Sequence, residues 1–157
     1  EKWTSIKEDF PKIKLHMIGK LQTNKVKYVL PLFDYIHSLD SFKLAQKIHN
    51  EQNKIKKKIK IFIQVNIGNE DQKSGVDKSD LIELFNYCKE LNLDVIGLMC
   101  IPPANEDPEE YFNETNLLNQ KLKLNELSMG MSSDFLKAVK NYSSYLRIGS
   151  SIFGKRI

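Results

Sequence analysis

The sequence predicts an α/β fold built from repeated β/α units around a parallel sheet. Short apolar runs alternate with longer amphipathic segments along the chain, which is the pattern of parallel strands joined by helices. No stretch rich in Pro or Gly divides the 157 residues, and a chain of this length has the usual size of one domain. We therefore expect a single α/β domain that spans residues 1–157.

Six apolar runs are predicted to form the strands of this sheet. Strands that are covered on both faces read as short apolar stretches, and each of these runs has that character. A closed eight-stranded barrel would need two more of them. The predicted strands cover residues 15–19, 35–40, 61–67, 95–101, 127–131 and 145–154.

Five amphipathic segments between these runs are predicted to be helices. Ser41 is placed to cap the second helix, and Asp134 with the two serines before it is placed to cap the last. Residues 77–80 put capping oxygens and negative charge ahead of an apolar helix face. The predicted helices cover residues 24–33, 41–53, 78–91, 108–122 and 133–142.

Two arrangements of these units fit the pattern, an open doubly wound sheet and a closed barrel. A GxGxxG or GxxxxGK[ST] turn after the first strand would favour the open sheet, and neither is present. A barrel places polar side chains on the inner face of its strands, near the carboxyl ends, where its binding sites are built. Polar residues do interrupt the strand-like runs, namely His16, Ser38, Gln64, Asn66, Ser128 and Arg147.

These six polar residues allow two interpretations. Each of them alone is explained by a structural hydrogen bond, because a buried polar group costs free energy unless it is paired. If they converge on one place, they form either a mutual network or a site for a polar ligand. Taken together they favour a ligand site.

The composition is that of a globular protein without a membrane segment. An apolar fraction of 41% and a charged fraction of 28% are too balanced for a disordered chain. No apolar run approaches the roughly 20 residues that span a bilayer, and the first residues lack the apolar core of a signal peptide. We expect a cytoplasmic protein with no membrane partner.

Neither nucleic acid nor a metal ion is an expected partner. Of the 24 basic residues only two are Arg, Lys is spread along the chain, and the dense lysine run at 54–60 is explained by a solvated loop. Cys88 and Cys100 form no CxxC pair and have no His cluster beside them. Buried, reduced thiols are therefore predicted instead of a zinc site.

The run 145–154 carries the sharpest functional signal. Gly149, Ser150 and Ser151 form a turn whose backbone N–H groups and hydroxyls suit a phosphate, which barrels often hold in the loops after their last two strands. Arg147 lies just before this turn and cannot lose its charge, so its burial demands a carboxylate, a phosphate or an unprotonated ring nitrogen. The alternatives are an ordinary glycine turn and a structural ion pair.

A second signal lies in residues 127–135. Ser128 can donate to a phosphate oxygen, Gly130 lets a backbone or a ligand approach closely, and Met129 with Met131 can pack on a flat ring. The alternative is that both methionines belong to the core. Residues 132–134 are interpreted separately, as the N-terminal cap of the following helix.

Six stretches of the chain, in order and spacing, resemble the pyridoxal phosphate homeostasis protein family. They are LHMIGKLQTNK, HSLDS, IQVNIGNEDQKSGV, GLMCIPP, LSMGMSSDF and LRIGSSIFGKR. The resemblance runs from Leu15 to the end of the chain, and it implies a (β/α)8 TIM barrel of the alanine racemase N-terminal type with pyridoxal 5'-phosphate (PLP) as cofactor. It also implies that residues 1–157 form one partial PLP-binding barrel domain, which lacks the first two β/α units and keeps about six of eight.

The resemblance implies roles for the residues that match family motifs. Arg147 matches the arginine that faces the pyridine nitrogen, and keeping that nitrogen unprotonated weakens the ring as an electron sink. Ser128, Gly149 and Ser150 match the phosphate cradle, and His16 matches a histidine of a family strand motif. The expected cofactor-binding residues are His16, Ser128, Met129, Gly130, Arg147, Gly149 and Ser150, with no catalytic residue and no metal ligand.

The resemblance places the Schiff-base lysine of the family upstream of residue 1, in a strand that this chain is expected to lack. No lysine here matches that motif, and Lys20 and Lys25 beside the first loop are assigned no role. The implied function is reversible binding of PLP and its delivery to PLP-dependent apoenzymes in vitamin B6 homeostasis, by a monomer without catalytic turnover. The alternative is a PLP-dependent amino-acid racemase or decarboxylase on the same barrel, which would need an acid/base Tyr or Cys from another domain.

Overall fold

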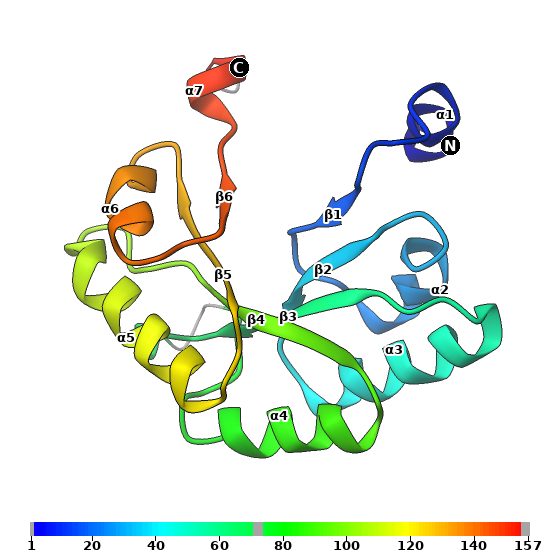
Figure 1. The fold of residues 1–157 in the computed structure, drawn as a ribbon, viewed down its shortest axis with the longest axis horizontal. Coiled ribbons are helices and arrows are strands. Elements are labelled where there is room, and N and C mark those ends of the chain that lie inside the picture. Colours follow the sequence, from blue (N-terminus) through cyan, green and yellow to red (C-terminus); the bar gives the residue numbers. More distant parts are fainter. Residues whose placement is uncertain (1, 71–73, 155–157) are drawn as a thin grey trace.

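A computed structural model describes residues 2–70 and 74–154, and it contains the predicted α/β fold with a parallel sheet (Figure 1). The six strands pair only in parallel and follow the chain order from β1 to β6. The sheet bends into an open half-barrel, of which β1 and β6 are the two edges. The strands are β1 (His16–Met17), β2 (Tyr35–Leu39), β3 (Lys60–Val65), β4 (Asp94–Cys100), β5 (Glu126–Met131) and β6 (Tyr145–Arg147).

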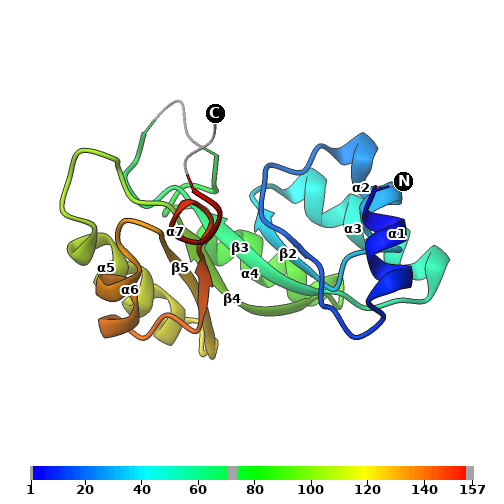
Figure 2. The same cartoon turned by 90° about the horizontal axis from the view of Figure 1, so that it is seen from above.

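Most of the helices follow a strand and cover the convex side of the half-barrel, as the two views show (Figures 1 and 2), whereas the first helix precedes the first strand and the last lies at the carboxyl ends of the strands. This is the arrangement of successive β/α units, in which each helix packs back onto the sheet. The helices are α1 (Lys2–Asp9), the 3₁₀-helix η1 (Thr23–Lys25), α2 (Val26–Val29), α3 (Phe42–Ile55), α4 (Leu81–Glu90), α5 (Pro108–Lys121), α6 (Phe135–Lys140) and α7 (Ser150–Phe153).

The main core lies between the sheet and these helices. Strand residues such as Ile61, Ile63 and Leu98 are fully buried there against helix residues such as Ile48 and Leu84. Because side chains alternate along a strand, the residues between them point to the concave face. Polar and aromatic side chains therefore collect on the concave face while the apolar set faces the helices.

Several predicted boundaries are wrong. The run 145–154 is a strand only as far as Arg147 and then turns into α7, because Gly149 begins a short helical turn. The predicted helix 24–33 is divided into η1 and the short α2, which ends ahead of Pro31, since a proline disfavours helical backbone at the residue before it. Residues 71–73 and 155–157, which complete two of the family-like stretches, lie outside the described residues.

The predicted helix caps are confirmed at one position and wrong at two. The hydroxyl of Ser41 accepts a hydrogen bond from the backbone N–H of Leu44 at the start of α3. Asp80 caps α4 without a side-chain hydrogen bond, and Asp134 accepts from the backbone N–H of Met131 instead of from its own helix. Both cysteines are buried thiols, as predicted.

Gly97 is the residue at which β4 and β5 approach too closely for a side chain. A Cβ atom at this position would lie 1.9 Å from the backbone oxygen of Glu126 on β5. We predict that Gly97→Ala lowers the free energy of unfolding by at least about 2 kcal/mol, because the backbone of a paired strand must move. Urea unfolding measures this effect. Gly19→Ala is the control, since a Cβ there meets nothing within 4 Å; similar losses in both variants would contradict the prediction.

Candidate cofactor-binding site

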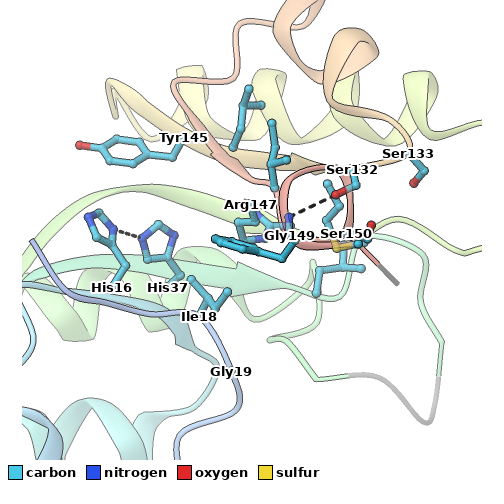
Figure 3. Close-up of a pocket in the computed structure, with 16 residues that line it drawn as sticks. His16, Ile18, Gly19, His37, Ser132, Ser133, Tyr145, Arg147, Gly149 and Ser150 are labelled. Atoms are coloured by element: carbon cyan, nitrogen blue, oxygen red, sulfur yellow. Dashed lines mark hydrogen bonds between the residues drawn. The ribbon is translucent and has the colours of Figure 1, made fainter. Parts of the chain in front are cut away.

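A cavity of about 1070 Å³ lies at the carboxyl ends of the strands, on the concave side of the sheet (Figure 3). This is the place where α/β sheets and barrels bind their ligands. Its walls come from β1, β2 and β6 and from the segments that follow β1, β4, β5 and β6. The lining residues are His16, Ile18, Gly19, His37, Ile101, residues 131–133, residues 145–150, Phe153 and Gly154.

Arg147 is a largely buried cation in the wall of this cavity. Its Nη1 donates to the backbone oxygen and to the hydroxyl of Ser128, at 2.8 Å each, and its Nη2 donates to the backbone oxygen of Cys100 at 2.9 Å. Burial lowers the pKa of the guanidinium, but an arginine side chain stays charged in proteins. All three partners are neutral, and Arg147 forms no ion pair with a carboxylate in the described part of the chain. The site therefore holds a positive charge without a negative partner among the residues described, which a hydrogen-bond acceptor on a ligand would stabilise.

A hydrogen-bonded chain leads from Arg147 across the sheet to β1. The hydroxyl of Ser128 lies 2.8 Å from Nδ1 of His37, and Nε2 of His37 lies 2.9 Å from Nδ1 of His16. Figure 3 shows the two imidazoles side by side beneath the cavity. Three of the predicted polar residues thus form one network, and His37 connects them.

Burial keeps both histidines of this network neutral. Desolvation lowers the pKa of His37 to about 3, and the neighbouring His16 and Arg147 add to the shift because a further positive charge beside them is unfavourable. Desolvation also lowers the pKa of His16, although the carboxylate of Asp34 opposes the shift. At neutral pH the positive charge among the described residues of the lining therefore resides on Arg147.

Three further aromatic rings, of Tyr35, Phe62 and Tyr145, pack against the two imidazoles and form the floor of the site with them. The ring of His16 stacks on Tyr35 with centroids 4.0 Å apart, and the ring of His37 stacks on Phe62 at 4.4 Å. Tyr145 on β6 contacts Tyr35 at 5.8 Å and Phe62 at 5.2 Å. Burial and a hydrogen bond to Tyr35 raise the pKa of Tyr145 to about 12. Edge strand β6 thus meets β2 and β3 across the concave face, although it pairs only with β5.

The turn that follows β6 lies at the other end of the cavity, beside Ser132 (Figure 3). The hydroxyl of Ser132 accepts from the N–H groups of Gly149 and Ser151, at 3.2 Å each. A Cβ atom at Gly149 would meet nothing within 4 Å, so the turn is open. These N–H groups already hold one oxygen atom, and they are of the kind that holds phosphate oxygens.

The structure separates the predicted site residues into two sets. His16, Arg147, Gly149 and Ser150 line the cavity. Ser128 is fully buried beneath it, Met129 lies in the core, and Gly130 packs against α6, where a Cβ atom would lie 2.6 Å from Cβ of Ala138. Whether any of these residues contacts a cofactor stays a prediction.

The other predicted polar residues bind elsewhere or have no partner. Gln64 and Asn66 donate to the backbone oxygens of Ser74 and Glu70 in the loop after β3. The hydroxyl of Ser38 is buried and has no hydrogen-bond partner in the described part of the chain.

Sequence reasoning missed His37, Ser132 and Tyr145. His37 lies one residue before the predicted Ser38 in the HSLDS stretch, and its two-residue spacing from Tyr35 indicates the same sheet face. Ser132 was interpreted only as part of a helix cap. No sequence signal joins Tyr145 to Tyr35, because the two strands approach each other only through the curvature of the sheet.

The cavity lining contains no lysine among the residues that the structure describes, and Lys20 and Lys25 lie outside it. Within residues 2–70 and 74–154 there is also no group of three or more His, Cys, Asp or Glu side chains able to hold a metal ion. None of the helices in these ranges combines the length and the apolar content needed to cross a bilayer.

Comparison with known proteins identifies the class of this fold. The family model for the alanine racemase N-terminal domain matches residues 5–156. In the structure of PipY from Synechococcus elongatus with PLP bound, the matching chain is 30% identical, with a TM-score of 0.88 over 96% of this chain and 75% of that one. A viral arginine decarboxylase, at 12% identity and a TM-score of 0.65, shares the fold alone.

Curated relatives narrow the class further. A pyridoxal phosphate homeostasis protein of Aquifex aeolicus is 44% identical over 90% of this chain and 66% of its own length. One from Vibrio alginolyticus is 37% identical over 95% of this chain and 69% of its own length. The chain therefore belongs to the pyridoxal phosphate homeostasis proteins, within the alanine racemase N-terminal domain family. It spans about two thirds of the length of these relatives.

The neutral state of His37 predicts a loss of stability in acid. The folded pKa of about 3 lies below the unfolded value of 6.5, so the unfolded chain binds more protons below pH 6.5 and stability falls from there toward pH 3. Between pH 7 and pH 5 we expect His37 to account for a loss of about 2 kcal/mol in the free energy of unfolding. His37→Gln should remove this part of the loss, as measured by urea unfolding at both pH values. The control is His49→Gln on α3, and an equal slope in wild type and His37→Gln would contradict the prediction.

Proposed function

We propose that this chain carries most of a site that binds PLP reversibly, and that the whole protein buffers PLP and supplies it to apoenzymes. The observation that carries the proposal is the cavity itself. One of its walls holds a largely buried guanidinium that has no carboxylate partner among the described residues, and another contains Gly149 and Ser150 in a turn whose N–H groups, at Gly149 and Ser151, bind the hydroxyl oxygen of Ser132. A ligand with a ring nitrogen and a phosphate offers an acceptor to the guanidinium and, in place of the Ser132 hydroxyl, to these N–H groups. The names of the curated relatives and the PLP in the PipY structure support the same ligand.

The proposal gives each residue a place relative to the cofactor. Arg147 would face the pyridine nitrogen, and Gly149 and Ser150, together with Ser132, would hold the phosphate. His16 would contact the cofactor from the opposite wall. Ser128 would hold Arg147 in place instead of contacting the cofactor, since its hydroxyl is buried and already accepts from Arg147. Met129 and Gly130, beside it on β5, would support the site from beneath the cavity.

Bound PLP supplies an aldehyde and an electron-withdrawing ring, and the residues of this cavity are poorly suited to exploit them. A guanidinium at the pyridine nitrogen keeps that atom unprotonated and so weakens electron withdrawal. Tyr145, with its pKa raised to about 12, is a poor general base at neutral pH. We infer a cofactor-handling protein without turnover and do not favour the racemase or decarboxylase alternative.

The proposal extends to the rest of the protein. We propose that the half-barrel is completed by two further β/α units, one of which carries the Schiff-base lysine. The two unpaired sheet edges, the lysine-free lining of the cavity and the matched share of the relatives support this view. We also propose that the whole protein is a cytoplasmic monomer and that it delivers PLP to PLP-dependent apoenzymes.

The phosphate end of the site gives the sharpest test. Ser150→Ala should weaken PLP binding by roughly 1.5 to 3 kcal/mol, the range for a hydrogen bond to a charged group, and should change pyridoxal binding much less. Fluorescence titration of both ligands measures this difference. The matched control is Ser79→Ala at the exposed start of α4. Absence of PLP binding to the wild-type chain, or equal losses for both ligands, would refute the assignment.

A further inference from the structure

The hydrogen-bonded chain from Arg147 to His16 has a direction. A guanidinium has no acceptor, so the hydroxyl of Ser128 must accept from Nη1 of Arg147 at 2.8 Å. The hydroxyl carries one hydrogen of its own. Its other partner in the described part of the chain is Nδ1 of His37, also at 2.8 Å.

Only one of two arrangements satisfies every hydrogen at Ser128. If His37 donated from Nδ1, the hydroxyl would accept twice and its own hydrogen would have no acceptor among the described residues. Ser128 is fully buried, so water cannot take that place, and a buried donor without a partner is unfavourable. Ser128 therefore donates to Nδ1 of His37, and the hydrogen of the neutral imidazole lies on Nε2.

The hydrogen on Nε2 of His37 also sets the direction of the hydrogen bond between His37 and His16. Nε2 of His37 lies 2.9 Å from Nδ1 of His16, so His37 donates and His16 accepts. A neutral His16 then carries its hydrogen on Nε2. The stack on Tyr35, at 4.0 Å, holds the ring in this orientation.

We propose that His37 is a positioning residue that fixes His16 as the Nε2–H tautomer, and that this N–H is a donor for an oxygen atom of the ligand at the cavity rim. The ligand class is one with a carboxylate, phenolate or carbonyl oxygen opposite the group that Arg147 binds. The ligand part rests on the proposed function, whereas the tautomer part rests on the network alone.

The surroundings of both rings support the neutral state. His37 faces His16 from β1, Phe62 from β3, Ser128 from β5, and Tyr145 and Arg147 from β6, with Tyr35 on its own strand. None of these groups is a carboxylate. Asp34 acts on His16, but desolvation outweighs it and the pKa of His16 stays lowered.

His49 provides an internal reference, because its hydrogen bonds require the other tautomer, with the hydrogen on Nδ1. Its Nδ1 lies 2.7 Å from the backbone oxygen of Leu91, which can only accept, so Nδ1 must carry the hydrogen. Nε2 of His49 then accepts from the side-chain amide of Asn53 at 3.0 Å. The chain has three histidines, and the structure therefore assigns a tautomer to each of them.

Long-range ¹H–¹⁵N NMR of the histidine rings tests the tautomers in the whole chain at neutral pH. We expect neutral Nε2–H rings for His16 and His37 and an Nδ1–H ring for His49. Ser128→Ala should return His16 and His37 to a mixture of tautomers and leave His49 unchanged, whereas Ser128→Thr, which keeps the hydroxyl, should preserve the wild-type pattern. An Nδ1–H ring or an imidazolium at His16 or His37 in the wild-type chain would overturn the proposal.

Addition of PLP to the same sample tests the ligand part. We expect the Nε2 signal of His16 to shift on binding while that of His49 stays in place. If the backbone signal of Gly149 shifts and that of His16 does not, the ligand part is wrong although the proposed function stands. If no signal shifts, PLP does not bind, and the ligand part falls together with the proposed function.

Discussion

A buried guanidinium without an acid partner is the constraint on which this site depends. Arg147 donates its three hydrogen bonds to two backbone oxygens and one hydroxyl, which solvate the charge without neutralising it. A buried cation in such surroundings is costly until an acceptor arrives. The neutral histidines on the same network add no charge, so Arg147 is the positive centre among the described residues that line the cavity, and it gives an electron-rich ligand atom a defined place.

The curvature of the sheet makes this arrangement possible. Apolar residues of the strands pack against the helices, and the alternating residues are left to fill the concave side with rings. His16, Tyr35 and His37 come from β1 and β2, and Tyr145 comes from β6 at the other edge. Their contacts span an opening that backbone pairing does not close. The aromatic floor thus supports the cavity and fills the concave side of the half-barrel.

The sequence was sufficient for the order of elements and for part of the site. Apolar runs separated by amphipathic segments predict β/α units reliably, and an arginine followed by a Gly-Ser-Ser turn is conspicuous in an apolar strand. His37 was missed because its role comes from Ser128, which lies 91 residues further along the chain, and such a pairing leaves no local signal. Met129 and Gly130 were predicted as site residues from the motif around them. Both residues instead face the helices, where Met129 lies in the core and Gly130 packs against α6. The pairing of β5 with β6 is irregular between Ser128 and Met131, so simple alternation along the strand does not predict these positions.

The central claim is that one ligand joins Arg147 to the Gly149 turn. A crystal structure of the chain soaked with PLP tests this most directly. We expect a phosphate on the N–H groups of Gly149 and Ser151, in place of the Ser132 hydroxyl that they bind in this structure, and a pyridine nitrogen within hydrogen-bond distance of the Arg147 guanidinium. A cofactor bound to a lysine on the outer surface, with the cavity occupied only by solvent, would contradict it.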